Sequence, residues 1–207
     1  MKRVDGELED RRGAGAVERL AARGLITRPS KTMTLPPGVP GGGVNKFFSK
    51  TMKLNNIDTV PYLTYNSLSE INFINHAFTT RLGGVSTGEF TSMNMAFNRG
   101  DNPDSVTENY KRFCKSAGFD YESLVASAQD HHTVVRAVTS AEKGIGIYKP
   151  RDMESVDALI TNEKGVTLVT YYADCTPLFF VDTKNKAIGL AHAGWRGTVG
   201  RIGEKGC

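Results

Sequence analysis

One segment, residues 172–197, constrains the fold more than any other part of the chain: YADCTPLFFVDTKNKAIGLAHAGWRG. It contains two runs of β-prone residues, PLFFVD and KAIGLAHAG, on either side of the short polar stretch TKN. Two such runs around a short turn predict a β-hairpin. The segment also holds Cys175, one of three cysteines, and His192, one of four histidines. Both scarce residues therefore lie at the ends of one predicted hairpin.

This hairpin places Cys175 and His192 opposite each other, or nearly so. Antiparallel strands pair residues that lie at equal distances from the turn, which we centre between Thr183 and Asn185. Directly opposed Cβ atoms lie about 4.5–5.5 Å apart, close enough for a shared metal or a thiol–imidazole pair. A slip of one residue would put the two side chains on opposite faces.

A zinc site on this pair needs a further ligand, because catalytic zinc typically has three protein ligands and an open position. AQDHHTV offers His131 and His132, of which only one points into a given cavity if the backbone is extended. A thiolate with two imidazoles suits Zn²⁺, with copper as the alternative metal. The competing interpretation is that Cys175 is a buried core thiol and the histidines are ordinary polar groups.

Two further groups could contact a ligand. Arg81 lies in TTRLGGVSTG, where adjacent glycines allow close backbone approach and a guanidinium suits phosphate or carboxylate. Trp195 and Arg196 follow His192, and the indole offers a flat face for stacking on a base. A plain turn with a surface arginine, and core packing of the tryptophan, are the alternatives.

Charge and composition divide the chain near residue 46. Residues 1–50 carry 10 Lys and Arg against 5 Asp and Glu, whereas the remainder, with 16 against 17, is nearly neutral. GAVERLAARGLI predicts a short helix stopped by Gly24, and the Pro- and Gly-rich stretch after it is typical of a linker. We expect residues 1–45 to be a flexible or unrelated segment and residues 46–207 to form the main domain.

Several classes of protein are disfavoured. No apolar run approaches the roughly 20 residues that cross a bilayer, and no apolar region follows the basic N-terminus as in a secretory signal. Three widely spaced cysteines are typical of reduced thiols, and the nearly neutral main body argues against a nucleic-acid surface. We expect a cytoplasmic globular protein without a membrane or nucleic-acid partner.

Strands outnumber helices in the predicted main domain. The strong helix signal is GDNPDSVTENYKRFCKSAG, capped by Asp101 or Asn102, with Pro103 in its first turn and its end before Gly118. Strand-like runs occur in INHAFTT, LVASAQDHHTVVRAV, VDALITN and GVTLVTYYADC. Because long helices do not alternate regularly with these strands, we expect an α+β sandwich rather than a doubly wound fold.

These pieces together resemble the YfiH-like family of multicopper-polyphenol-oxidase-like proteins, whose members are also called purine nucleoside phosphorylases and laccase-domain proteins. The matching stretches cover roughly residues 55–203 in the family's order: HAFTTRLGGVSTGEFTSMNMAF, GDNPDSVTENYKRF, AQDHHTVV, DALITN, ADCTPLFFVD and AIGLAHAGWRGTVGRI. The resemblance implies a layered α/β/β/α sandwich, the fold shared with cytotoxic-necrotising-factor-type cysteine hydrolases. Because family members usually continue well beyond residue 207, it also implies that the closing part of the fold is missing.

The resemblance also implies a metal site. Its ligands come from a Gln-x-His motif, an Ala-Asp-Cys motif and a His-Ala-Gly-Trp-Arg motif, which here supply His131, Cys175 and His192. The spacing from Gln129 selects His131, but the family usually has a small residue where His132 stands. The choice between His131 and His132 as the metal ligand is therefore left open by the sequence.

The implied activities are phosphorolysis of adenosine, inosine, guanosine and methylthioadenosine, and deamination of adenosine. In deamination, zinc would lower the pKa of the attacking water and Asp174 would carry protons. In phosphorolysis, Arg81 would hold phosphate. Arg196 and Trp195 are candidates for substrate binding, and Asn94 for contact with ribose or base. The expected partners are thus purine nucleosides and phosphate.

Three alternatives compete with this function. A copper-dependent phenol oxidase is an older assignment in the family, but laccase chemistry draws on several copper centres and this chain has 4 histidines in all. A metal-free cysteine hydrolase or deamidase would use Cys175 as nucleophile and His192 as base. A non-catalytic fragment is the third, given the early end of the chain.

Overall fold

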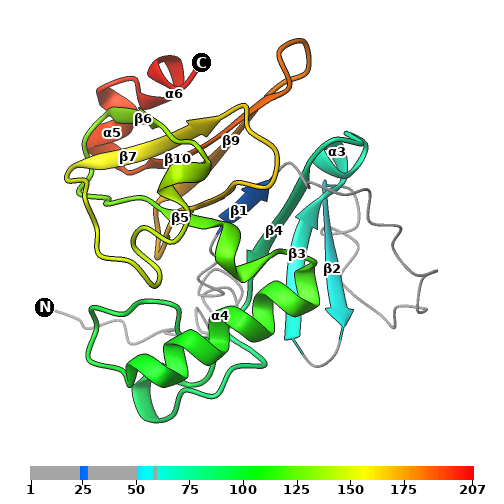
Figure 1. Cartoon of the computed structure of the whole chain (residues 1–207), viewed down its shortest axis with the longest axis vertical. Coiled ribbons are helices and arrows are strands. Elements are labelled where there is room, and N and C mark those ends of the chain that lie inside the picture. Colours follow the sequence, from blue (N-terminus) through cyan, green and yellow to red (C-terminus); the bar gives the residue numbers. More distant parts are fainter. Residues whose placement is uncertain (1–23, 28–50, 58–59) are drawn as a thin grey trace, which may run out of the picture.

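The structure is a computed structural model that describes residues 24–27, 51–57 and 60–207 (Figure 1). Its strands are β1 (Gly24–Thr27), β2 (Met52–Ile57), β3 (Val60–Tyr65), β4 (Asn75–Thr79), β5 (Leu124–Ala126), β6 (Val134–Ala137), β7 (Val156–Thr161), β8 (Thr167–Val169), β9 (Thr176–Asp182) and β10 (Ala187–Ala193). Its helices are α3 (Asn66–Ser69), α4 (Pro103–Ala117), α5 (Trp195–Val199) and α6 (Ile202–Lys205), with 3-10 turns η1 (Gly88–Phe90), η2 (Tyr121–Ser123) and η3 (Ser140–Glu142).

The strands form two sheets between layers of helix (Figure 1). One sheet has the order β2-β3-β4-β1-β8-β5 and the other β6-β7-β10-β9. Leu168 of β8 and Leu190 of β10 belong to one buried cluster, so the sheets face each other. Helix α4 packs on the first sheet through Phe113, and α6 packs on the second through Ile202. The predicted α/β/β/α layering and α+β class are confirmed.

Helix α4 forms as its sequence predicts. The side chain of Asn102 accepts a hydrogen bond from the backbone N–H of Asp104, and Pro103 is the first helical residue. Gly118 ends the helix with a φ of 73°, in the left-handed region that glycine adopts without steric cost. Tyr110 and Phe113 are fully buried against the first sheet. In the described parts of the chain, no helix has the length and apolarity to cross a membrane.

Strand β1 lies inside the first sheet, although it comes from the segment that we expect to precede the main domain. It pairs antiparallel with β4 on one side and β8 on the other. Residues 24–27 therefore do not lie apart from the fold, and a boundary near residue 46 does not hold for them. The helix and linker predicted around this strand fall on residues outside the described ones.

Strands β9 and β10 form the predicted hairpin, in a register that sets Cys175 and His192 nearly, but not directly, opposite each other. His192 pairs with Pro177 and Ala193 with Thr176, so Cys175 lies just before β9. The register differs by two residues from one that sets Cys175 directly against His192. Because side chains alternate between faces, a shift of two leaves both residues on the same face and diagonal to each other.

His76 on β4 allows the fold to be tested independently of any function. It is only 3 % exposed, and its Nε2 accepts the backbone N–H of Tyr65 at 2.7 Å. Burial lowers the pKa of His76 from 6.5 to about 4. Between these values the unfolded chain binds this proton and the folded chain does not. Stability is therefore retained above pH 6.5 and lost as the pH falls toward 4.

We expect this one group to reduce the free energy of unfolding by about 3 kcal/mol between pH 7 and pH 4. In His76→Gln, whose amide oxygen can still accept the N–H of Tyr65, most of that acid-dependent loss should disappear. Urea unfolding of both proteins at a series of pH values measures the difference. The same pH dependence in both proteins would contradict a buried, neutral His76.

Candidate metal centre

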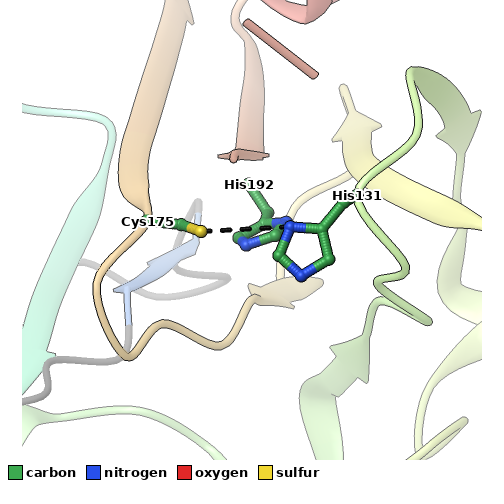
Figure 2. A group of neighbouring side chains, drawn as sticks. All are labelled: His131, Cys175 and His192. Carbon is green, nitrogen blue, oxygen red and sulfur yellow. Dashed lines mark hydrogen bonds between the residues drawn. The ribbon is translucent and has the colours of Figure 1, made fainter. Parts of the chain in front are cut away.

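Three side chains from separate segments converge at one point (Figure 2). His131 lies in the loop between β5 and β6, Cys175 immediately precedes β9, and His192 is on β10. One ligand atom from each lies within 4.8 Å of the others. The Sγ of Cys175 is 4.0 Å from Nδ1 of His131, and the two imidazole rings are 4.8 Å apart between centroids. The structure thus brings together the three residues that the sequence predicts as metal ligands.

Gln129 explains how the His131 loop reaches the cysteine segment. Its Oε1 accepts the backbone N–H of Tyr171 at 2.6 Å, and its Nε2 donates to the carbonyl of the same residue at 2.6 Å. The hydroxyl of Ser127 also donates to Oε1, at 2.8 Å. The side-chain amide therefore bonds like one residue of a β-ladder, and it ties the segment before His131 to the segment before Cys175.

His132 points away from this cluster. Its Nδ1 is hydrogen-bonded to Oδ1 of Asp130 at 2.7 Å, and its side chain is 61 % exposed. It is also not among the residues whose ligand atoms come together. Of the two neighbouring histidines, the structure places His131 in the cluster and leaves His132 at the surface.

Gly194 leaves room for an ion. A Cβ atom added at this position would lie 2.5 Å from Nδ1 of His131 and 3.3 Å from Sγ of Cys175. Any side chain here would fill the space beside two of the three ligand atoms. The donor set also fits, because one thiolate and two imidazoles match catalytic zinc sites that keep a fourth position open.

A cavity of about 1070 Å³ contains the cluster in its wall. Ligand pockets commonly measure about 300–1,000 Å³, so a nucleoside fits within it. Asp174, which we predict to carry protons, also lines the cavity and is exposed. Asn94 lines it as well, but its Oδ1 accepts from Ala96 and its Nδ2 donates to Asp101. Both polar ends of Asn94 thus have partners within its own loop.

Three residues predicted to bind substrate or phosphate are not part of this cavity wall. Arg81 donates from its Nη2 to the carbonyl of Thr91 at 3.2 Å. Trp195 is 73 % exposed on α5, and the guanidinium of Arg196 lies 5.4 Å from the centre of its ring. Core packing of the tryptophan does not occur. The roles of these residues in binding stay predictions.

Sequence reasoning missed two kinds of residue at this site. Lys149 and Arg151 line the cavity and give it positive charge. Asp157 is fully buried on β7, and its Oδ1 lies 2.7 Å from Nδ1 of His192. The available signal for Asp157 was a charged residue inside the apolar strand VDALIT, which otherwise has no reason to carry one.

The surroundings of Cys175 do not activate its thiol in the metal-free protein. Partial burial raises its pKa, and the negative charges of Asp174 and Asp157 raise it further. Reactive cysteines have the opposite setting, in which positive charge lowers the pKa. The hydrogen-bond contact of the sulfur is with His131, while Nδ1 of His192 is bound to Asp157. This geometry does not favour a Cys175–His192 dyad.

Comparison with known proteins gives consistent matches over the same part of the chain. Residues 75–207 match the family model described as multi-copper polyphenol oxidoreductase laccase. The chain is 40% identical over 125 residues to purine nucleoside phosphorylase YlmD of Geobacillus stearothermophilus, covering 60% of this chain and 46% of the relative. It is 41% identical over 130 residues to a purine nucleoside phosphorylase of Deinococcus radiodurans, covering 63% and 47%.

A solved structure agrees with these matches. The crystal structure of the hypothetical protein YfiH of Bacillus licheniformis superimposes with a TM-score of 0.60 at 29% identity, covering 66% of this chain and 51% of that one. The chain thus spans about half the length of the curated relatives it matches.

Proposed function

The chain belongs to the multi-copper polyphenol oxidoreductase laccase family, and from this membership we propose that it is a zinc-dependent enzyme acting on purine nucleosides. The reactions proposed are phosphorolysis of adenosine, inosine, guanosine and methylthioadenosine, and hydrolytic deamination of adenosine. The names of the relatives support the nucleoside substrate. The observation that carries the proposal is the convergence of three metal-ligating atoms in the wall of a nucleoside-sized cavity.

The donor set favours zinc, which His131, Cys175 and His192 would hold with one position left for water or substrate. When bound, zinc supplies a Lewis acid that activates water and polarises substrate oxygen atoms. Copper is the alternative metal. Oxidation of phenols by several copper centres has less support, because the described residues provide one cluster of three or more potential ligands.

The cavity residues have complementary roles in this proposal. Asp174, with an exposed carboxylate next to Cys175, would give or accept protons at the reacting base. Phe97 and Tyr171 line the cavity and would stack on the purine. Lys149 and Arg151 line it with positive charge and are better placed for phosphate than Arg81.

The test is a panel of purine nucleosides, with and without phosphate, run together with elemental analysis of the purified chain. We expect about one zinc per chain, release of free purine base that requires phosphate, and conversion of adenosine to inosine that does not. A folded, zinc-loaded chain that turns over none of these nucleosides would refute the proposed activity and favour a non-catalytic protein. Activity that survives without metal but is lost on thiol alkylation would favour a cysteine hydrolase.

A further inference from the structure

We propose that Asp157 is a positioning residue that assembles the candidate metal centre before an ion arrives. It would fix the tautomer of His192 and hold the backbone of the loop that carries His131. The inference rests on the metal site of the proposed function, but not on the substrate. Asp157 lies on β7 with none of its surface exposed, so its carboxylate has to be satisfied by groups of the protein itself.

Four N–H groups surround this carboxylate. Oδ1 lies 2.7 Å from Nδ1 of His192 and accepts the backbone N–H of His131 at 3.1 Å. Oδ2 accepts the backbone N–H groups of His132 at 2.9 Å and Asp130 at 3.3 Å. An ionised carboxylate offers about four acceptor sites, so these donors use its whole capacity.

The contact with His192 decides which ring nitrogen can bind a metal. Because an ionised carboxylate only accepts hydrogen bonds, Nδ1 of His192 has to carry the hydrogen. In the neutral ring, Nε2 is then left with a free lone pair, as a metal ligand requires. Metal-binding histidines commonly donate their other N–H to a carboxylate in this way.

The contacts with the loop hold the other histidine. Successive N–H groups of residues 130–132 point at one carboxylate, an arrangement that forms a concave anion site in the backbone. His131 has a φ of 71°, in the left-handed region that is unfavourable for a residue other than glycine. The bonds to Asp157 offset this cost and keep the loop in place. One buried carboxylate therefore positions two of the three candidate ligands.

Asp157→Asn is the informative substitution, because it keeps the size of the side chain but replaces one accepting oxygen by a donating NH₂ group. If the NH₂ faces His192, that ring has to accept through Nδ1 and carry its hydrogen on Nε2, where it blocks metal binding. If the NH₂ faces the opposite way, it meets the N–H groups of residues 130 and 132, which lose their acceptor.

Two measurements test the role of Asp157. Nuclear magnetic resonance of the ring nitrogens in the metal-free, ¹⁵N-labelled wild type is expected to show His192 with its hydrogen on Nδ1. Competition with a chromophoric chelator is expected to show zinc affinity about 10–100-fold lower in Asp157→Asn than in the wild type. Asp152→Asn is the matched control, because its carboxylate accepts from the guanidinium of Arg136 instead of from the groups around Asp157 or the three candidate ligands. Both readouts should stay at wild-type values in that variant.

A hydrogen on Nε2 of His192 in the metal-free wild type would overturn the proposal, whether or not the variant folds. The proposal would also be overturned if the Asp157→Asn variant is shown by circular dichroism to be folded and binds zinc as tightly as the wild type. A chain that passes both tests but turns over no purine nucleoside would refute the proposed activity and leave the role of Asp157 intact.

Discussion

Cys175→Ala is expected to reduce bound metal from about one ion per chain to none and to abolish nucleoside turnover with it. Two imidazoles would remain, one fewer than the three protein ligands of a typical catalytic zinc site. Loss of an outer partner of a metal site costs about 10–100-fold in affinity, and loss of the thiolate itself should exceed that range. Elemental analysis and equilibrium dialysis against Zn²⁺ measure the loss.

The chain offers two controls for this experiment. Cys207 is exposed, its Sγ donates to the carbonyl of Gly203, and it is not among the residues whose ligand atoms come together. Cys114 is buried in the core beside Phe113 and takes no part in the site. Alanine at either position should leave one metal ion bound. Retention of metal and turnover in Cys175→Ala would refute the metal site as a whole.

The features predicted correctly from sequence depend on neighbours along the chain. Helix α4 follows from Asn102, Pro103 and Gly118, which set its two ends, and from an apolar face repeated along one segment. The hairpin follows from two β-prone runs around a turn. Both signals lie within about 20 residues, where local conformational preferences and side-chain periodicity decide the structure.

The exact register of that hairpin is a feature that the local sequence does not determine. Asp182 accepts the backbone N–H groups of Lys184 and Asn185, and Lys186 adopts a φ of 56°. Asp182 then pairs with Ala187, so Lys186 belongs to the loop together with the predicted stretch TKN. This loop sets His192 against Pro177, within the range of direct or near opposition to Cys175 that the sequence predicts. Cys175 and His192 still lie on one face of the hairpin, because this register differs from direct opposition by an even number of residues.

The features that could not be predicted from the sequence depend on contacts between segments that lie far apart along the chain. Strand β1 is only four residues long, and its place depends on β4 and β8, which lie far along the chain. The role of Asp157 likewise depends on the loop of His131 and on β10. Neither arrangement leaves a periodic pattern in the sequence. The one signal in the sequence was Asp157 itself, a charged residue in the apolar strand β7. That pattern indicates a buried carboxylate, but it does not identify the groups that the carboxylate bonds to.

His131→Asn and His132→Asn form a matched pair that tests the last choice left open by the sequence. Asparagine is used because it tolerates the left-handed backbone of His131, with its φ of 71°, better than alanine does. We expect His131→Asn to lose metal binding by more than about 100-fold, beyond the cost of losing an outer partner. The reason is that Nδ1 of His131 lies 4.0 Å from Sγ of Cys175, across the space that Gly194 leaves open.

His132→Asn should bind metal as tightly as the wild type, because the ring that it removes is bonded to Asp130 at the surface and lies outside the cluster. The backbone N–H of residue 132, which bonds to Asp157, is unchanged in this variant. Titration of both apo-proteins with Zn²⁺ against a competing chelator gives the two affinities directly. The reverse result is tight binding in His131→Asn and loss in His132→Asn. It would mean that the loop of residues 130–132 changes conformation on binding metal and brings His132 into the cluster. The assignment of the third ligand would then pass to His132, while the roles of Cys175 and His192 would remain.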